Sequence, residues 1–401
     1  MDEMNPLPLA GKHIVLGVTG SISAYKAADT CSKLRQAGAT VEVVMTPAAT
    51  QFVSALTFQS LTGRPVVVDM FTAAEAEAHV EVARRADALV ISPATADCLA
   101  NLAHGRTPDM VALTALATTA PVLVAPAMDS QMWAHPATQE NVITLRNRGV
   151  DFVGPNEGRL ASGRMGFGRL AETPEVVGAL RVLLGQRTGE LAGRHIVVSA
   201  GGTQEALDPV RFIGNRSTGK MGFAIAEAAR DRGAHVTLVT GPVALETPYG
   251  VQRIDVVTVA EMLVALEQAT ADSDAIIMAA APADYRAAHP SEHKMKKTAG
   301  DDLTVVLAKN SDIIATLPGG GVRVGFAAET RNLGEYAKAK LPGKRLDFIV
   351  ANDVSAAGSG FGTETNQVTI YHDNGSHEEL PLMSKYAVAL AILDRVRARF
   401  D

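Results

Sequence analysis

Four short runs of small and hydroxylated residues are the first candidates for chemistry in the amino-terminal half. They occupy residues 19–23, 46–50, 92–96 and 126–129, and each follows an apolar stretch. Backbone N–H groups at the start of a helix, joined by hydroxyl groups, form a binding site for anions. Any one run is equally explained as ordinary turn or N-cap chemistry. Four such runs together favour a ligand that carries phosphate.

The second half offers cations and an amide instead. Arg211, Asn215 and Arg216 lie within residues 208–222, and Lys294 opens a lysine-rich run. A lysine run is typical of a solvated face. This run follows an apolar strand end, however, and reactants that carry phosphate would need local cations because the chain has a net charge of −6.

Residues 156–169 are rich in glycine and arginine and are too irregular to predict a helix or a strand. A surface linker and a mobile lid over a ligand site both fit this composition. The choice stays open at this point.

The elements that must position these runs alternate between strand and helix. Strands are predicted at residues 13–18, 40–46, 88–92 and 121–125, and helices at 21–37 and 174–184. Ile22, Tyr25, Ala28 and Leu34 give the first helix its apolar spacing. Continuous apolar strands that alternate with helices predict a parallel sheet covered on both faces. Ligands of such sheets bind at the carboxyl ends of the strands.

The second half repeats this alternation, and the stretch Gly-Lys-His-Ile-Val of residues 11–15 is echoed as Gly-Arg-His-Ile-Val at 193–197. The fold class predicted is therefore α/β with two doubly wound domains, divided into residues 1–190 and 191–401. The elements expected after residue 190 are strands at 195–200, 235–240, 275–280, 322–327 and 347–351, a late edge strand at 367–372, and helices at 219–231, 259–269, 333–339 and 385–398.

Several classes of protein are disfavoured by what the sequence lacks. No Gly-x-Gly-x-x-Gly follows the strand at 195–200 and no P-loop is present, which argues against an NAD or P-loop enzyme. Cys31 and Cys98 cannot form a disulfide framework, and no signal peptide is apparent, so a cytoplasmic protein is expected. The uncharged stretch 110–128 contains two prolines and fits a buried helix and strand better than a membrane span. The negative net charge gives no footprint for nucleic acid.

Nine stretches occur in a fixed order along the chain: residues 17–26, His79, 92–96, 126–133, 208–222, 279–285, 294–297, 325–330 and 351–353. Together they resemble one known family, the bifunctional phosphopantothenoylcysteine decarboxylase / phosphopantothenate–cysteine ligases of coenzyme A synthesis. The resemblance covers nearly the whole chain.

The resemblance implies two Rossmann-like domains, a flavodoxin-like flavin domain followed by a CTP-dependent ligase domain. It implies that 4′-phosphopantothenate and CTP form an acyl-cytidylate, that cysteine displaces CMP, and that the product is decarboxylated to 4′-phosphopantetheine. The implied cofactors are FMN and Mg²⁺. The implied assembly is a homo-oligomer with trimeric flavin domains and dimeric ligase domains, which together suggest a dodecamer.

A cysteine carboxylate is a poor substrate for decarboxylation because no neighbouring group accepts the electron pair. Oxidation of the CH₂–SH group to a thioaldehyde creates an acceptor, and FMN can take the hydride and later return it. His79 matches the family's active-site histidine, a base or an orienting group; from its local sequence a solvated helix position is the default. The residues implied to bind FMN are Gly20, Ser21, Ile22, Thr46, Pro47, Ala48, Ser92, Pro93, Ala94, Thr95 and Ala127.

In the ligase half the resemblance assigns charge stabilisation during acyl-cytidylate formation to Lys294. It assigns orientation of the activated carbonyl to Asn215. A triphosphate reaction of this type implies Mg²⁺ that bridges the phosphates of CTP. The sequence shows no metal cage made by protein alone. The remaining residues implied to bind substrate are Arg211, Met278, Ala279, Ala280, Asp284, Ser311, Asp312, Ile313, Ile314, Phe326, Lys340 and Lys344.

Two positions depart from the family pattern. Asp129 stands where the family often has an asparagine that binds the substrate carboxylate, and Ser162 stands where it often has an acidic cysteine. A carboxylate facing a carboxylate repels, so Asp129 is expected to be protonated or moved aside. A second hypothesis is therefore an active ligase with an altered or inactive decarboxylase domain. A third, a non-catalytic regulatory flavoprotein, is disfavoured by the intact ligase motifs.

Overall fold

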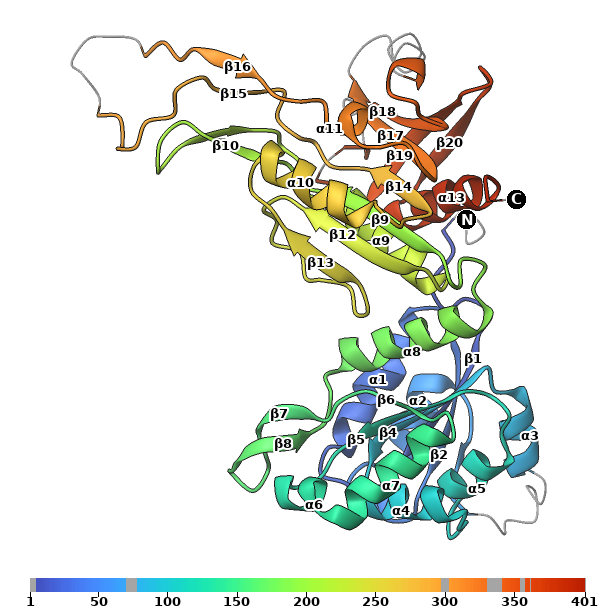
Figure 1. Ribbon diagram of the computed structural model, residues 1–401. Coiled ribbons are helices and arrows are strands. Elements are labelled where there is room, and N and C mark those ends of the chain that lie inside the picture. The colour runs from blue at the N-terminus through green and yellow to red at the C-terminus, as the bar shows by residue number, and fades with distance from the viewer. Residues whose placement is uncertain are drawn as a thin grey trace. The chain divides into compact units, whose positions relative to one another are not determined.

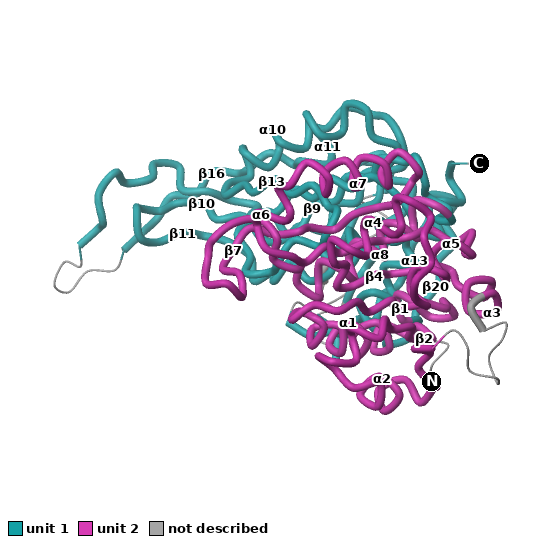
Figure 2. The backbone as a smooth tube through the Cα atoms, turned by 90° about the horizontal axis from the view of Figure 1, so that it is seen from below, with its two compact units in different colours: residues 1–6, 188–401 teal, residues 7–187 magenta. Residues whose placement is uncertain are grey.

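The computed structural model describes residues 5–69, 78–296, 303–329, 341–353, 358–360 and 362–400. Its contacts divide the chain into two compact units (Figure 2). The N-terminal unit, magenta in the figure, comprises Leu7–Arg187. The C-terminal unit, teal, comprises Met1–Pro6 and Thr188–Asp401. Each unit is described by itself.

The N-terminal unit is a doubly wound α/β domain (Figure 1). Its six-stranded sheet has the order β3-β2-β1-β4-β5-β6 and every neighbouring pair is parallel. The strands are β1 His13–Val18, β2 Thr40–Met45, β3 Val66–Val67, β4 Ala88–Ala94, β5 Val122–Pro126 and β6 Asp151–Phe152. The helices are α1 Ala24–Gln36, α2 Ala55–Thr62, α3 Ala78–Arg85, α4 Ala96–His104, α5 Met110–Ala117, α6 Ser130–Ala134, α7 Pro136–Asn147 and α8 Thr173–Thr188.

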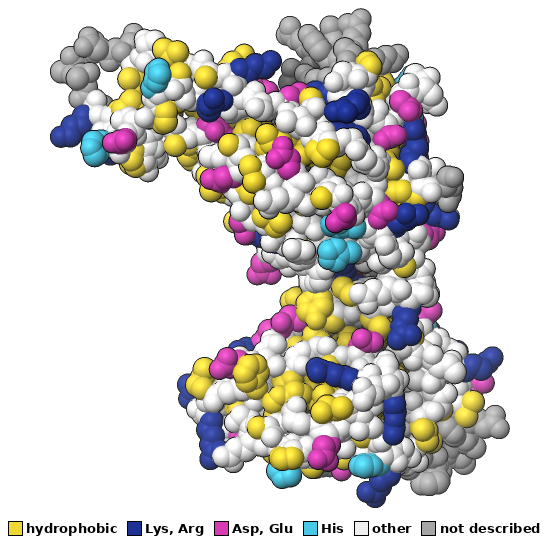
Figure 3. Space-filling view, viewed as in Figure 1, with side chains coloured by type: hydrophobic (Ala, Val, Ile, Leu, Met, Phe, Trp, Pro, Cys, Tyr) yellow, Lys and Arg dark blue, Asp and Glu magenta, His cyan; other side chains and the backbone are white. Residues whose placement is uncertain are grey.

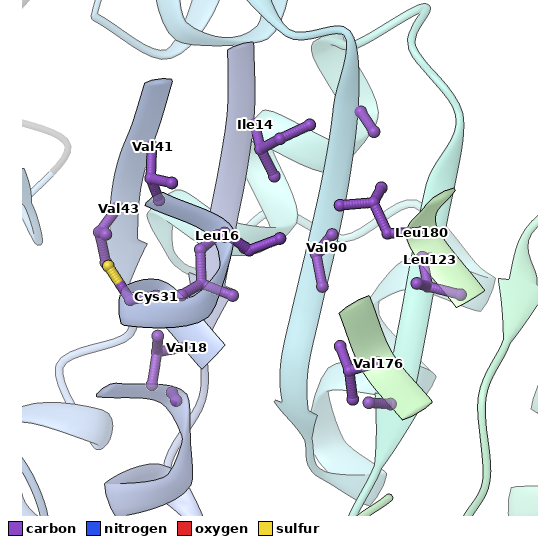
Figure 4. Close-up of a cluster of buried hydrophobic side chains, with 14 of the residues drawn as sticks. Ile14, Leu16, Val18, Cys31, Val41, Val43, Val90, Leu123, Val176 and Leu180 are labelled. Atoms are coloured by element: carbon purple, nitrogen blue, oxygen red, sulfur yellow. The ribbon is translucent and has the colours of Figure 1, made fainter. Parts of the chain in front are cut away.

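Alternating side chains of the N-terminal strands form two cores. Ile14, Leu16 and Val18 of β1 lie on the face covered by α1 and α8, where Figure 4 shows them with Cys31 and Leu180. The side chains between them lie on the opposite face, which α3, α4, α5 and α7 cover. Both faces are buried, which explains why these strands are continuous apolar runs.

Residues 156–169 form an antiparallel hairpin of β7 Asn156–Arg159 and β8 Met165–Arg169. The expectation of an irregular segment was therefore wrong. The hairpin begins beyond β6 and lies against α6 (Figure 1). Gly168 allows the approach, because a Cβ there would lie 2.2 Å from the Met128 carbonyl oxygen. The Met128 N–H donates to the Gly168 carbonyl at 3.0 Å. This tertiary contact is not visible in the local sequence.

The C-terminal unit repeats the same strand order. Its sheet runs β13-β12-β9-β14-β17-β18-β19-β20, parallel through β18 and antiparallel after it. The strands are β9 His195–Ala200, β10 Gln204–Ala206, β11 Phe212–Gly214, β12 His235–Thr240, β13 Gln252–Asp255, β14 Ala275–Met278, β15 Tyr285–Ala287, β16 Leu307–Lys309, β17 Val322–Glu329, β18 Phe348–Asp353, β19 Thr365–His372 and β20 His377–Ser384. The helices are α9 Lys220–Asp231, α10 Val259–Ala269, α11 Ile313–Thr316 and α13 Lys385–Arg397.

Helices α9 and α13 pack on one face of the C-terminal sheet, and α10 and α11 pack on the other. Two small antiparallel pairs, β10–β11 and β15–β16, follow the ends of β9 and β14. The strand predicted at 367–372 is present as β19, but it is not the edge of the sheet. The edge is β20, and Pro381 within it fits that place because proline removes a ladder donor.

In both units a buried threonine joins the first strand to its neighbour at the point where the strand order reverses. The Thr19 hydroxyl donates to the Pro93 carbonyl at 2.7 Å and accepts from the Thr95 N–H at 3.1 Å. The Thr203 hydroxyl accepts from the Ala283 N–H at 2.9 Å. Each threonine is 1% exposed. Ligands of doubly wound sheets bind at this reversal, so the two threonines mark the two candidate sites.

The predicted α/β class and the doubly wound architecture are confirmed. The helix predicted at 333–339 lies outside the described residues. Ile22 and Tyr25 do not belong to the buried face of α1; they are 58% and 63% exposed, and Ala24, Ala27, Thr30, Cys31 and Leu34 are buried instead. Among the helices that the structure describes, none combines the length and hydropathy needed to cross a bilayer.

Close packing of α9 on β9 gives a testable consequence. A Cβ at Gly222 would lie 2.6 Å from the Ala200 Cβ and 2.8 Å from the Ser199 carbonyl oxygen. Gly222→Ala is therefore expected to lower the free energy of unfolding by about 1–3 kcal/mol. Gly320→Ala is the matched control, since nothing lies within 4 Å of its Cβ position. Urea unfolding measures both variants, and equal stabilities would contradict this packing argument.

Candidate functional site

The carboxyl edge of the N-terminal sheet brings the predicted cofactor-binding runs together. Gly20 lies against Ala48, since a Cβ on Gly20 would be 2.6 Å from the Ala48 Cβ. The Ala127 N–H donates to the Ala94 carbonyl at 3.0 Å. Thr19, in the run at 19–23, is hydrogen-bonded to Pro93 and Thr95 in the run at 92–96. Residues from the ends of β1, β2, β4 and β5 therefore share one edge.

One polar atom at this edge has no hydrogen-bond partner among the residues that the structure describes. Ser92 is completely buried, and its hydroxyl makes no hydrogen bond in the described part of the chain. A buried hydroxyl without a partner loses free energy, so such a group points to a missing donor or acceptor. Together with the close glycine contact, this fits a bound group with polar ring atoms and phosphate.

A cavity of about 620 Å³ opens beside this edge. Of the residues predicted to bind or react, it brings together Ser21, Ile22, Asp129 and Ser162. The remaining predicted cofactor residues lie at the same edge but do not line the cavity. The other lining residues are Ser23, Tyr25, Lys26, Met128, Arg159, Leu160, Ala161, Gly168 and Arg169.

The two residues that depart from the family pattern bond to each other. The Ser162 hydroxyl donates to Asp129 Oδ2 at 2.9 Å. The other Asp129 oxygen caps α6 by accepting from the Gln131 N–H at 3.0 Å. The Gln131 N–H, the Ser162 hydroxyl and the positive charge of Arg164 lower the pKa of Asp129. These contacts favour the ionised form of the carboxylate. The expectation that Asp129 is protonated or moved aside next to a substrate carboxylate stays a prediction.

Lys26 and Arg169, which sequence reasoning missed, belong to one ion-pair network. Lys26 lies 3.1 Å from Glu172, and Arg169 also pairs with Glu172. The Lys26 ammonium is the larger cause of the lowered pKa of Glu172. Position gives one signal for Lys26, because it lies in the first turn of α1, directly after the run at 19–23, and it lines the same cavity as Ser21 and Ile22.

Neither cysteine replaces the missing acidic thiol. Burial raises the pKa of Cys31 to about 11, and it raises the pKa of Cys98 as well. Neither lines the cavity. His79 is the second residue of α3.

In the C-terminal unit, Asn215 is fixed to the loop after β14. Its amide donates to the Pro282 carbonyl at 2.9 Å and to the Ala281 carbonyl at 3.2 Å. Gly202, at the end of β9, pairs with Ala281 in a parallel bridge. Asn215 therefore lies at the reversal of the strand order, where a doubly wound sheet binds its ligand.

Asp208 is the anchor of the segment that carries Lys294. Its buried carboxylate accepts from the Arg211 guanidinium, from the Arg211 N–H at 2.9 Å and from the Met295 N–H at 3.2 Å. Arg211 also donates to the Met295 carbonyl at 3.1 Å. The Arg211 side chain is therefore committed to this anchor. The Arg211 hydrogen bonds are the largest cause of the strongly lowered pKa of Asp208.

The other residues predicted to bind substrate in the C-terminal unit divide into two kinds. Ile313 and Ile314 are buried in the core with Met278, so any contact there would use their backbone. Asp284, Ser311 and Asp312 are exposed, while Ala279, Ala280 and Phe326 are half-buried. Asp312 and Lys344 form an ion pair at 2.9 Å. Lys340 lies outside the described residues.

The position of α11 depends on a buried arginine. Arg323 is 4% exposed and donates to the Pro318 carbonyl at 2.8 Å and to the Ile314 carbonyl. Burial lowers the pKa of Arg323. The described residues contain no cluster of three His, Cys, Asp or Glu side chains that could hold a metal ion.

The Asp208 anchor predicts a particular dependence of stability on pH. Because folding lowers its pKa, Asp208 stabilises the fold above its unfolded value near 3.9, and this contribution is lost as the pH falls toward the folded value. Asp208→Asn is therefore expected to melt several degrees below the wild type at pH 7, with a smaller difference near pH 3.

Thermal unfolding between pH 7 and pH 3 measures this difference. Asp255→Asn is the control, because Asp255 pairs with Arg253 but is 68% exposed and should matter little. A difference between wild type and Asp208→Asn that does not change with pH would contradict the argument.

Known families match both halves of the chain. A family described as "Flavoprotein" matches residues 4–185, and one described as "DNA/pantothenate metabolism flavoprotein C-terminal domain" matches residues 191–400. Among solved structures, the C-terminal domain of a coenzyme A biosynthesis bifunctional protein CoaBC is 38% identical, with a TM-score of 0.46, over 53% of this chain and 98% of its own. The FMN-dependent cysteine decarboxylase TvaF from thioviridamide biosynthesis is 31% identical, with a TM-score of 0.35, over 36% and 91%.

Curated relatives match along nearly the whole length. The coenzyme A biosynthesis bifunctional protein CoaBC of Vibrio vulnificus (strain YJ016) is 45% identical over 97% of this chain and 98% of its own. The proteins of the same name from Bacillus subtilis (strain 168) and Escherichia coli (strain K12) are each 44% identical, over 97% and 98% of this chain and over 98% and 99% of their own. The chain is therefore a member of the family of bifunctional coenzyme A biosynthesis enzymes, CoaBC.

Proposed function

We propose that the C-terminal unit joins cysteine to 4′-phosphopantothenate with CTP, and that the N-terminal unit decarboxylates the product to 4′-phosphopantetheine. The observation that carries this proposal is that one chain retains both sets of loops, each at the carboxyl edge of its own doubly wound sheet. The order follows from the chemistry, because the amide product of the first step is the substrate of the second.

In the ligase step, a carboxylate oxygen of 4′-phosphopantothenate attacks the α-phosphorus of CTP and pyrophosphate leaves. The amine of cysteine then attacks the acyl carbon and CMP leaves. We propose that the Lys294 ammonium stabilises negative charge in the first displacement. Lys294 is exposed, and the bonds of Asp208 and Arg211 to Met295 hold the adjoining backbone. Asn215, held by two carbonyls, would orient the activated acyl group.

Mg²⁺ would be held mainly by the phosphates of CTP. This ion takes oxygen ligands, keeps several waters and needs few protein carboxylates, so the donor set of the described residues is compatible with it. Its role would be to neutralise charge on the triphosphate.

The decarboxylation proposal assigns FMN to the edge where Gly20, Ser21, Thr46, Ser92 and Thr95 lie. The buried Ser92 hydroxyl and the Gly20–Ala48 contact support this assignment. Bound FMN would supply a reversible acceptor of hydride from the substrate carbon that bears sulfur. His79 would take or direct the substrate proton, since an imidazole titrates near operating pH. Ser162, bonded to Asp129, would hold the hairpin at the cavity.

The competing hypothesis is a ligase with an inactive flavin unit. The products of the complete reaction distinguish the two hypotheses. The full chain is incubated with 4′-phosphopantothenate, cysteine, CTP and Mg²⁺, and the products are identified by mass. We expect 4′-phosphopantetheine. Accumulation of phosphopantothenoylcysteine would favour the competing hypothesis, and absence of any CTP-dependent product would refute both.

Two substitutions are expected to separate the half-reactions. Lys294→Gln should slow CTP-dependent ligation by roughly 100-fold and leave decarboxylation of supplied phosphopantothenoylcysteine unchanged. His79→Asn should slow decarboxylation by roughly 100-fold and leave ligation unchanged. Each variant is the control for the other, and each half-reaction is timed on its own substrate. Loss of both activities in either variant would contradict the assignment to separate units.

Assembly into trimers through one unit and dimers through the other stays a prediction. Light scattering tests it, because a species of 42.0 kDa in solution would contradict it.

A further inference from the structure

The wall of the N-terminal cavity carries an excess of positive charge. Lys26, Arg159 and Arg169 line it, and Asp129 is the acidic residue among its described lining. Glu172, which does not line the cavity, pairs with both Lys26 and Arg169. The wall and this partner together hold three cations and two carboxylates. Basic side chains, dark blue in Figure 3, lie along the outer edge of this unit where Figure 1 places the hairpin.

Arg159 is the cation of this wall for which the described part of the chain provides no partner. Lys26 and Arg169 are committed to Glu172, whereas the Arg159 guanidinium makes no hydrogen bond or ion pair within the described residues. A planar guanidinium can bind a carboxylate with two parallel hydrogen bonds. Its unused donors therefore suit an anionic ligand of the cavity.

The hairpin fixes where Arg159 lies. It is the last residue of β7 and pairs with Met165 of β8. The turn that follows is closed by the Leu160 N–H, which donates to the Arg164 carbonyl at 2.8 Å. The Ser162 hydroxyl then ties the tip of this turn to Asp129. The guanidinium therefore extends from a backbone that is held on both sides.

Asp129 itself is unsuited to bind a substrate carboxylate. It is ionised, and its oxygens accept from Gln131 and Ser162, so it offers repulsion and no donor. We propose that Arg159 binds the carboxylate of the cysteine moiety of phosphopantothenoylcysteine, while Asp129 and Ser162 position the hairpin that carries it. This inference rests on the decarboxylase function proposed above.

Three ligands that cannot be turned over test the proposal, because none contains a thiol. N-(4′-phosphopantothenoyl)serine carries phosphate and carboxylate. N-(4′-phosphopantothenoyl)ethanolamine carries the phosphate alone, and pantothenoylserine carries the carboxylate alone. Isothermal titration calorimetry on the full, flavin-loaded chain gives the dissociation constant of each.

Arg159→Ala is expected to weaken binding of the two serine ligands by roughly tenfold, as for loss of a charge-assisted hydrogen bond, and to change the ethanolamine ligand less than twofold. Arg159→Lys keeps the positive charge but loses the planar pair of guanidinium donors. Its dissociation constants for the serine ligands should lie between those of Arg159→Ala and the wild type. Arg164→Ala is the matched control, because this arginine belongs to the same turn but does not line the cavity. It should bind all three ligands as the wild type does.

Two results would overturn the proposal while the wild type binds normally. Equal weakening of both phosphorylated ligands, with pantothenoylserine unaffected, would assign Arg159 to the phosphate. If the dissociation constants of all three ligands stay unchanged, Arg159 takes no part in substrate recognition. If the wild type binds none of the ligands and forms no 4′-phosphopantetheine, the decarboxylase function itself fails, and this inference fails with it.

Discussion

Both units depend on the same small interaction, a buried threonine hydroxyl that bridges the first strand and its neighbour where the strand order reverses. Parallel strands diverge there, and the backbone groups of the loops lose their ladder partners. Thr19 satisfies a carbonyl and an N–H, and Thr203 satisfies an N–H, without filling the gap between the loops. The loops on either side of the reversal are therefore held in place, at the position where doubly wound sheets bind their ligands.

The two units use this shared frame for different chemistry. The N-terminal edge carries hydroxyls, small side chains and a buried serine that has no partner among the described residues, which suits a bound aromatic cofactor with phosphate. The C-terminal edge is built from side chains that fix backbone: Asn215 holds the loop after β14, and Asp208 holds the lysine segment. The exposed Lys294 is thus placed by a buried carboxylate, Asp208, whose charge Arg211 neutralises.

Much of this fold could be predicted because its strands are buried on both faces. β1, β9 and β12 have the bounds expected from their continuous apolar runs. The hairpin at 156–169 could not be predicted, because its glycines carry no propensity and its support comes from Met128, far away in sequence. The candidate site divides in the same way. The loop residues could be predicted because they come directly after predicted strands. The wall cations Lys26, Arg159 and Arg169 could not, because their place at the cavity depends on tertiary packing. The exposure of Tyr25 was missed because helical spacing alone does not say which stripe faces the core.

The cap of α6 has a consequence for how this enzyme can vary. Asp129 begins that helix by accepting from the Gln131 N–H, and aspartate and asparagine are about equally good in this role. The family that the sequence resembles often has asparagine there. A single change between the two leaves the helix start intact and alters the charge inside the cavity by one unit. The helix cap therefore constrains the shape of this position but not its charge, so the charge of the cavity wall can change here without loss of the helix start.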